Sequence, residues 1–305
     1  MRKSIIFAAA FLFSCATEPD TPSPPYSIDD WAYYLQNISI DSILQSGFDM
    51  VVMDYSRDGT REGEFSPREI SQIRERGIVP LAYLSIGEAE DYRFYWDTTW
   101  YESPPPWLGP ENPQWPGNYA VRYWDEGWRN IVFEYLDRII EQGFAGIYLD
   151  KVDEFEYWAD SLGEEETAGR MLALIREISE YVRQRAGDSF IILLQNGERI
   201  VEWDDGTLGD FISGWAVEDL FYDGTAPIDS QWVEERMKYL RPFVQKGAMV
   251  LVVDYVDDGS GHDGENLDRI RDFTERSMDA GLIPYAAMSD RELDEINIVE
   301  GIQPR

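Results

Sequence analysis

Six times along the chain, a helical stretch ends at a glycine and an apolar strand follows within a few residues. Glycine after a helix adopts the left-handed conformation without a Cβ clash, so it ends helices cleanly. The helix that ends at Gly143 has its apolar residues at the spacing of one buried stripe. That stripe is Trp128, Ile131, Val132, Tyr135, Leu136, Ile139 and Ile140, and the six glycines are Gly47, Gly77, Gly143, Gly187, Gly247 and Gly281.

The strands at these junctions are continuous apolar runs, which is typical of parallel strands covered on both faces. Two further runs, beginning at Trp31 and Phe211, bring the number of predicted strands to eight. Eight strands with helices between them predict an α/β fold, a single-domain (β/α)8 TIM barrel over residues 27–305. A doubly wound open sheet is the alternative, but the sequence has no glycine-rich phosphate loop.

The N-terminal residues have the composition of a targeting segment. Arg2 and Lys3 precede an apolar run that is too short to span a bilayer, so residues 1–14 are predicted to be a signal peptide. The run ends in "LFSC", similar to a bacterial lipobox, and we expect lipidation of Cys15, with plain secretion as the alternative. Residues 15–26 are proline-rich and are predicted to be a tether. We therefore expect an exported protein, lipid-anchored to the cell envelope (periplasmic or outer surface) or secreted, that contacts a membrane only through this anchor.

The chain is strongly acidic, with 59 acidic and 26 basic residues and a formal charge of −33. Such a surface repels nucleic acid, and we expect no nucleic-acid partner. It would attract cationic ligands, including polymers of free amino sugars, although an acidic surface also serves solubility or salt tolerance. Cys15 is the only cysteine, so no internal disulfide can form. Separately, we expect the protein to be a monomer.

Polar side chains end most of the predicted strands. In barrel enzymes the active site lies at the C-terminal ends of the strands, so these residues are expected to meet at one mouth. They are mainly acids, amides and tyrosines, with almost no base among them. They are Asp54, Tyr55, Tyr83, Ser85, Glu88, Asp150, Asp153, Gln195, Asn196, Glu198, Glu218, Asp219, Asp254, Tyr255, Ser289 and Asp290.

The single histidine excludes several chemistries. His262 lies in a glycine-rich loop, so a Ser-His-Asp or Cys-His mechanism has no histidine to use, and a zinc site lacks its usual ligands. The acidic stretch 54–65 partly matches a calcium-binding EF-hand loop, but Phe65 replaces the bidentate glutamate and the stretch follows a strand. We expect a plain loop there, no metal and no cofactor, while calcium binding by the acidic loops stays open.

After these exclusions, chemistry by a pair of carboxylates is the class of mechanism that remains. Two acids can cleave a glycosidic bond when one protonates the leaving oxygen and the other attacks the anomeric carbon or activates water. Asp150 and Glu218 end strands that are near neighbours around the barrel, so they can face each other across its mouth. The alternative is that strand-end acids cap the following helices. That alternative is favoured for Asp290, because Ser289 and Glu292 are spaced as a capping box and predict a helix start.

A tryptophan-rich insertion follows the third strand. Residues 91–128 contain six of the eleven tryptophans and many prolines. A long ordered loop over a barrel mouth is usually functional, and flat rings suit sugar faces and cations. We expect most of these rings to form the loop's own core and one or two to touch ligand.

The sequence resembles a known family in long, specific motifs from about Trp31 to about Leu293. They are "VVMDYSRDG", "LAYLSIGEAEDYRFYW", "WLGPENPQWPGNYAVRYWD", "GIYLDKVD", "QNGE", "VEDLFYDG" and "VVDYV". These motifs are similar to those of the polygalactosaminidase-like glycoside hydrolase family 114, in a branch found in bacteria and archaea. The resemblance implies a (β/α)8 barrel and internal cleavage of α-1,4-linked galactosamine polymers.

The resemblance also implies a carboxylate pair at the ends of strands four and six, here Asp150 and Glu218. By similarity to α-retaining barrels, Asp150 is expected to be the nucleophile and Glu218 the general acid/base. Binding of polysaccharide without cleavage, and cleavage of a neutral α-glycan, stay open as alternatives. The remaining strand-end residues would bind sugar or orient the pair: Asp54, Tyr55, Tyr83, Ser85, Glu88, Asp153, Gln195, Asn196, Asp219, Asp254 and Tyr255.

Overall fold

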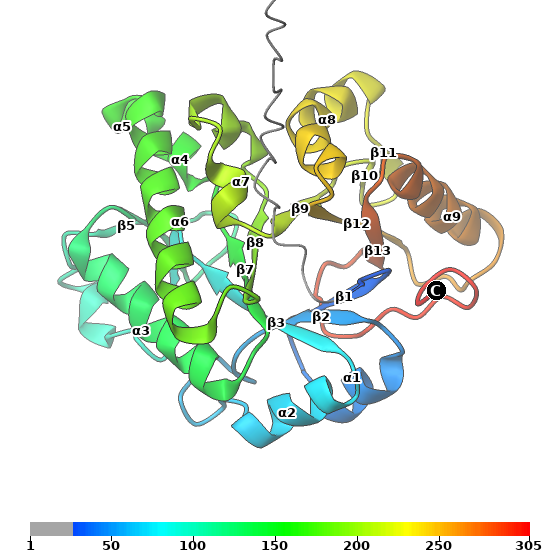
Figure 1. Cartoon of the computed structure of the whole chain (residues 1–305), viewed down its shortest axis with the longest axis horizontal. Coiled ribbons are helices and arrows are strands. Elements are labelled where there is room, and N and C mark those ends of the chain that lie inside the picture. The colour runs from blue at the N-terminus through cyan, green and yellow to red at the C-terminus, as the bar shows by residue number, and fades with distance from the viewer. Residues whose placement is uncertain (1–26) are drawn as a thin grey trace, which may run out of the picture.

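The computed structural model describes residues 27–305, and their main element is a sheet of eight parallel strands (Figure 1). The strands lie in the sheet in chain order, as in a (β/α)8 barrel, and helices cover the outer face. This confirms the predicted fold. The strands are β1 (Trp31–Tyr34), β2 (Met50–Met53), β3 (Val79–Ser85), β7 (Gly146–Asp150), β8 (Ile191–Gln195), β9 (Gly214–Glu218), β12 (Met249–Asp257) and β13 (Ile283–Met288).

Helices connect the strands, and smaller elements lie on the connections. The helices are α1 (Ile40–Ser46), α2 (Pro67–Glu75), α3 (Glu126–Gln142), α4 (Glu154–Tyr157), α5 (Ala159–Leu162), α6 (Glu164–Ala186), α7 (Leu208–Phe211), α8 (Ser230–Gln245) and α9 (Gly264–Asp279). Two 3₁₀ turns and five short strands complete the set: η1 (Thr98–Tyr101), η2 (Glu198–Trp203), β4 (Glu88–Glu90), β5 (Leu108–Glu111), β6 (Asn118–Val121), β10 (Tyr222–Asp223) and β11 (Ala226–Pro227).

The predicted glycine stops are present. Gly47 ends α1 with φ 84°, and Gly143 ends α3 with φ 88°, both in the left-handed region. Within α3 the predicted stripe is the buried face, which includes Trp128, Val132 and Leu136. Both helices therefore turn toward their next strand at a residue whose conformation glycine adopts without strain.

Each barrel strand has two buried faces, and they belong to two different cores. Alternate residues such as Tyr33, Tyr148 and Leu251 fill the barrel interior. Their neighbours, such as Leu149 and Val252, pack against the helices. Because successive strand residues point to opposite faces, position along a strand decides whether a side chain faces the interior or the helices.

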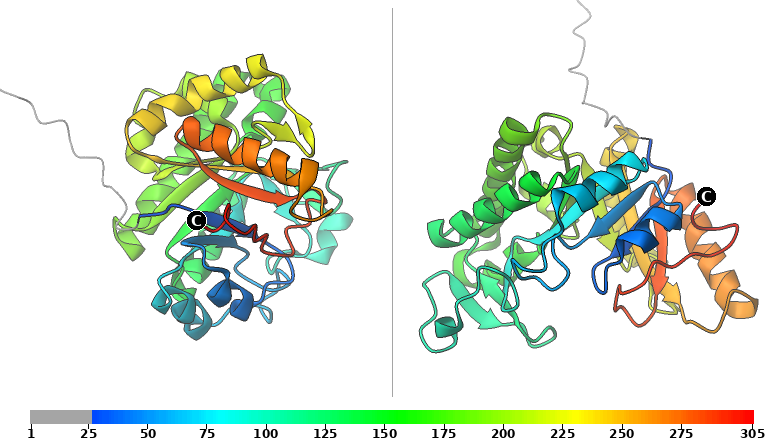
Figure 2. Two further views of the ribbon diagram at one scale, coloured as in Figure 1. Left: turned by 90° about the vertical axis from the view of Figure 1, so that its right-hand side faces the viewer. Right: turned by 90° about the horizontal axis from the view of Figure 1, so that it is seen from below.

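The barrel is closed at one seam by side chains in place of a backbone ladder. Backbone pairing is absent between β1 and β13 in the described residues, but the Trp31 indole donates to the Ile283 carbonyl at 2.9 Å. The Gln303 side chain accepts from the Ala286 amide at 2.8 Å and donates to its carbonyl at 2.9 Å, as a partner strand would. Figure 2 shows the C-terminal segment, in red, beside the first strand, in blue. There the Arg305 amide donates to Asp30 at 2.8 Å.

The helix predicted at Ser289 does not form, which corrects that prediction. The Asp290 carboxylate accepts the Glu292 amide at 3.1 Å in a local turn. Arg291 and Leu293 then have positive φ, 64° and 51°, which a helix cannot accommodate. Irregular chain therefore covers the seam where an eighth barrel helix would lie.

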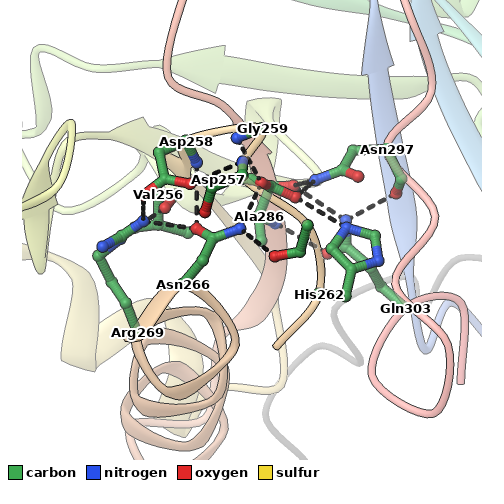
Figure 3. Close-up of polar contacts among 12 residues, drawn as sticks. Val256, Asp257, Asp258, Gly259, His262, Asn266, Arg269, Ala286, Asn297 and Gln303 are labelled. Atoms are coloured by element: carbon green, nitrogen blue, oxygen red, sulfur yellow. Dashed lines mark hydrogen bonds and ion pairs between the residues drawn. The ribbon is translucent and has the colours of Figure 1, made fainter. Parts of the chain in front are cut away.

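A polar cluster around Asp257 connects this irregular segment to β12 and α9 (Figure 3). The buried Asp257 carboxylate accepts hydrogen bonds from Asn266 at 2.8 Å, Asn297 at 2.9 Å and the Gly259 amide at 3.0 Å. His262 lies 3.1 Å from the same carboxylate. We call Asp257 and these four residues the Asp257 cluster. It attaches both the loop after β12 and the C-terminal segment to the barrel.

The tryptophan-rich insertion has its own small core, as expected. Strands β4, β6 and β5 form an antiparallel sheet, and Trp96, Trp100, Trp107 and Trp128 contact one another in series, with ring centroids 5.0 to 5.2 Å apart. Trp115 is different, since 58% of its surface is exposed. Contact of such a ring with ligand stays a prediction.

The signal peptide (1–14), the tether (15–26) and the Cys15 lipidation site lie outside the described residues. Across residues 27–305, no helix has the length and apolar character needed to cross a membrane.

Candidate active site

Two inward carboxyl groups stand at the C-terminal mouth of the barrel. Asp150 ends β7 and Glu218 ends β9, with only β8 between them. Tyr148 and Ala216, two residues before each acid, lie in the interior core, so the acids point inward as well. Gln195 ends β8 between them and accepts the Tyr33 hydroxyl at 3.1 Å. The structure therefore brings together the two acids that the sequence singled out.

Asp150 is a half-buried carboxyl group with few hydrogen-bond donors. The Tyr83 hydroxyl donates to its Oδ2 at 2.6 Å, and the Lys151 amide donates to its Oδ1 at 2.7 Å. Burial raises the pKa of Asp150 to about 7, and the charge of Glu218 adds to this rise. The Tyr83 hydrogen bond opposes both effects, because it favours the ionised form.

Glu218 is held from two sides. The Tyr255 hydroxyl donates to its Oε1, and the Asn196 side-chain amide donates to its Oε2 at 3.1 Å. Burial raises the pKa of Glu218, the hydrogen bonds from Tyr255 and Asn196 oppose that rise, and the charge of Asp219 adds to it. Both acids therefore keep a proton to higher pH than an exposed carboxyl group does.

The three strand ends share one backbone feature. The residue after each inward side chain has positive φ: Lys151 at 62°, Asn196 at 54° and Asp219 at 49°. Such a conformation costs free energy for residues other than glycine and persists where surrounding contacts hold it. The sequence analysis did not predict these left-handed residues. It turns the chain away from the mouth directly after Asp150, Gln195 and Glu218.

A second group of acids lies beside Asp150, between β7 and the insertion. Lys151 reaches Glu88 at 3.1 Å, and Asn112 and Asn118 donate to the same carboxylate at 2.8 and 3.3 Å. The predicted binding residue Glu88 is therefore buried and fully paired. Asp153 is half-buried at the edge of this group, and burial raises its pKa while Lys151 opposes the rise.

Asp54 is occupied by a buried arginine that the sequence analysis missed. Arg93, from the insertion, contacts Asp54 at 2.5 Å and Glu90 at 2.6 Å. The guanidinium carbon lies 5.9 Å from the centre of the Tyr83 ring, so this ion-pair group packs behind the tyrosine that holds Asp150. Asp54 thus shapes the wall of the mouth through Arg93.

Two predicted binding residues, Tyr55 and Asp254, do not face the mouth. Tyr55 and Asp254 are fully buried. The Tyr55 hydroxyl donates to the Gly59 carbonyl at 2.7 Å, and Asp254 accepts the backbone amides of Leu220, Phe221 and Tyr222, each at 2.8 Å. Both residues lie one position from an inward-facing residue and so point toward the helix layer. Ser85 is also buried, and its hydroxyl accepts the Glu88 amide at 3.2 Å.

Two further arginines, also missed, hold the rim near Glu218. Arg291 donates to both oxygens of Asp219 at 2.9 Å, and its guanidinium lies 4.3 Å from the centre of the Tyr255 ring. Arg236, from α8, contacts Glu198 and the backbone carbonyls of Glu218 and Asp219. Both contacts join segments distant in sequence, so no local pattern could have predicted them.

Side chains of the acidic loop at 54–65 form hydrogen bonds within the loop. Asp58 accepts the amide of Thr60 at 3.0 Å and its hydroxyl at 2.7 Å, and Ser56 also reaches it at 3.3 Å. Over residues 27–305 no group of three or more His, Cys, Asp or Glu side chains has an arrangement that could hold a metal ion.

Comparisons with known proteins agree with this architecture. The chain is 50% identical over 302 residues to an uncharacterized protein of Thermotoga maritima, covering 98% of this chain and 93% of that protein. It is 55% identical over 269 residues to an uncharacterized protein of Methanocaldococcus jannaschii, covering 88% and 78%.

Two solved structures share the fold at low sequence identity. The glycoside hydrolase domain of PelA from Pseudomonas aeruginosa has a TM-score of 0.68 at 18% identity, covering 89% of this chain and 98% of that domain. Aspergillus fumigatus Ega3 in complex with galactosamine has a TM-score of 0.64 at 14% identity, covering 94% and 98%. Residues 14–303 match glycoside-hydrolase family GH114, and with its barrel and paired strand-end acids the chain belongs to that family.

Proposed function

We propose that this protein is a retaining endo-glycosidase that cleaves an α-linked, galactosamine-containing polysaccharide, with α-1,4 linkages as the first candidate. The observation that carries the proposal is the pair of inward, half-buried acids, Asp150 and Glu218, whose pKa values are both raised. Membership of the glycoside hydrolases supports bond cleavage, and the Ega3 complex with galactosamine supports the choice of sugar.

In the first step, Glu218 gives its proton to the leaving glycosidic oxygen while the Asp150 carboxylate attacks the anomeric carbon. The bond from this carbon to the leaving oxygen breaks, and a covalent glycosyl ester to Asp150 forms. In the second step, Glu218 takes a proton from water, which attacks the same carbon and releases Asp150. Two inversions leave the anomeric configuration unchanged.

Each acid has a tyrosine suited to its proposed role. Tyr83 donates to Asp150 at 2.6 Å and stabilises the ionised form that attacks. Tyr255 and Asn196 hold the Glu218 carboxyl group in a fixed orientation at the mouth. Because the pKa of Asp150 is raised to about 7, its ionised, attacking form becomes more populated as pH rises through neutrality.

The charge of the molecule favours a cationic polymer. The formal charge of −33 and the acids at the mouth would concentrate amino sugars carrying free ammonium groups. A neutral α-glycan gains nothing from this field, so salt dependence separates the two substrates. Cleavage of the cationic polymer should slow as ionic strength rises, because exposed charges are then screened.

The decisive experiment compares wild type with Asp150→Asn and Glu218→Gln on partly deacetylated galactosamine polymers and on neutral α-glycans. Each substitution keeps the shape of the side chain and removes its acid–base chemistry, so each should lower kcat by at least ~10²-fold. NMR of the first product should show the retained anomer. Near-normal turnover in either variant contradicts the assigned pair, and release of the inverted anomer contradicts the nucleophile role.

A second candidate function is binding of polysaccharide without cleavage. The exposed aromatic rings favour it, since they lie on segments that follow strand ends: Tyr92, Tyr101, Trp115, Tyr157 and Trp232. Such rings stack on sugars whether or not a bond breaks. Binding on a glycan array with no product after prolonged incubation would favour this candidate over the enzyme.

A further inference from the structure

The side chain of Arg236 ends in the narrow space where β8 and β9 reach the mouth. Arg236 comes from α8 in the helix layer, and only 16% of its side chain is exposed. A guanidinium group has five N–H donors in a fixed planar fork. In this protein all five have acceptors, and every acceptor belongs to the ends of β8 and β9 or to the turns that follow them.

One edge of the fork holds the backbone that carries Glu218. Its Nη1 donates to the Glu218 carbonyl at 2.7 Å and to the Asp219 carbonyl at 3.1 Å. Asp219 is the residue with φ 49°, so the step that turns the chain away from the mouth is held by this contact. The two carbonyls point to one donor group because of that left-handed step.

The other edge fixes the side chain that contacts the Glu218 carboxylate. Nη2 donates to Asn196 Oδ1 at 3.4 Å and to Glu198 Oε2 at 3.3 Å, and Nε donates to Glu198 Oε1. Asn196 Oδ1 also accepts the Glu218 amide at 3.0 Å. Because its oxygen is held on this side, Asn196 must present its NH₂ group to Glu218 Oε2.

We propose that Arg236 is a positioning residue for Glu218: it fixes both the backbone under the carboxylate and the orientation of the Asn196 amide that donates to it. The proposal rests on the proposed function for its kinetic consequence. The fork matters more than the charge, since lysine has three donors on a flexible stem and cannot match five acceptors in one plane.

The test compares Arg236→Lys with Arg241→Lys. Arg241 lies on the same helix, is 46% exposed in its side chain and pairs only with Glu234 among the described residues, so its variant should behave as wild type. Arg236→Lys should lower kcat about 10- to 100-fold with little change in KM. The carboxyl ¹³C resonance of Glu218, assigned with Glu218→Gln, should titrate at higher pH, because the Asn196 hydrogen bond that favours the ionised form is weakened.

The NMR titration uses the free protein, so it tests the positioning role even if no substrate is cleaved. Arg236→Lys activity within twofold of wild type, or reduced activity with an unchanged Glu218 titration, overturns the proposal. If Arg236→Lys does not fold, Glu198→Gln removes one acceptor of the fork and should shift the Glu218 titration in the same direction by a smaller amount. An unchanged titration in that variant also overturns it.

Discussion

Asp150 and Asp257 both end buried barrel strands on the same side of the molecule, yet their surroundings shift their pKa values in opposite directions. Burial raises the pKa of Asp150 to about 7, with Glu218 adding its charge. Burial also acts to raise the pKa of Asp257, but hydrogen bonds from Asn266, Gly259 and Asn297 hold it below its usual range.

The difference is the number of hydrogen-bond donors and the presence of a second acid beside Asp150. Asp150 has two donors and an acidic neighbour, Glu218. Asp257 accepts three N–H groups and lies beside His262, the single histidine. A buried acid with its hydrogen bonds complete stabilises the fold, whereas one left short of donors beside another acid is available for chemistry.

The largest effect is expected at Asp257. Asp257→Ala leaves the buried side-chain amides of Asn266 and Asn297, and the partly buried Gly259 amide, without their acceptor, and each buried unsatisfied group costs about 1–3 kcal/mol. The free energy of unfolding should fall by about 3–5 kcal/mol in chemical denaturation at pH 7. The hydrogen bonds of the Asp150–Glu218 pair do not involve Asp257, so cleavage per folded molecule should persist. A decrease of less than about 1 kcal/mol in the free energy of unfolding would show that the Asp257 cluster does not stabilise the fold.

The opposite result is expected at Asp150. Its pKa is higher in the folded than in the unfolded protein, so its contribution to stability is complete below about pH 4 and is lost as pH rises through about 7. Asp150→Asn cannot ionise and avoids that loss. Since one pKa unit corresponds to about 1.4 kcal/mol, the variant should exceed wild type by roughly 1–4 kcal/mol at pH 8 and by much less at pH 4. Equal differences at both pH values would contradict the raised pKa.

The smallest effect is expected at His262. Its side chain is 38% exposed, and Asp257 keeps its three other donors when the imidazole is removed. His262→Ala should therefore lower the free energy of unfolding by less than ~1 kcal/mol and leave cleavage unchanged. A larger loss in thermal unfolding would mean that the imidazole, not the amides, dominates the cluster.

The fold was readable from the sequence because its signals are local. Each glycine stop and each apolar run lies within a few residues of the next, and all eight predicted strands are present. The helix predicted at Ser289 failed because Arg291 turns to Asp219 and Asp223, more than sixty residues away, and takes a left-handed conformation to do so. A capping pattern depends on residues close in sequence, so it cannot predict such a distant contact.

Only part of the candidate active site could be predicted from the sequence. Strand-end position alone grouped Asp254 with Tyr255, but neighbours on a strand point to opposite faces, and only Tyr255 reaches Glu218. Alternation with the inward Val253 would have separated them. Arg93 and Arg236 could not be found in this way, because one comes from the insertion and the other from a helix, and their partners lie on other strands.

The seam between β1 and β13 also places both ends of the described chain relative to the candidate active site. Asp30 and Arg305 meet beside the start of β1, at the end of the barrel opposite the strand ends that carry Asp150 and Glu218. The described chain therefore begins at the end of the barrel opposite the mouth. The start of the described chain and the candidate active site thus lie at opposite ends of the barrel, so a long polymer can approach the mouth without passing the point where the described chain begins.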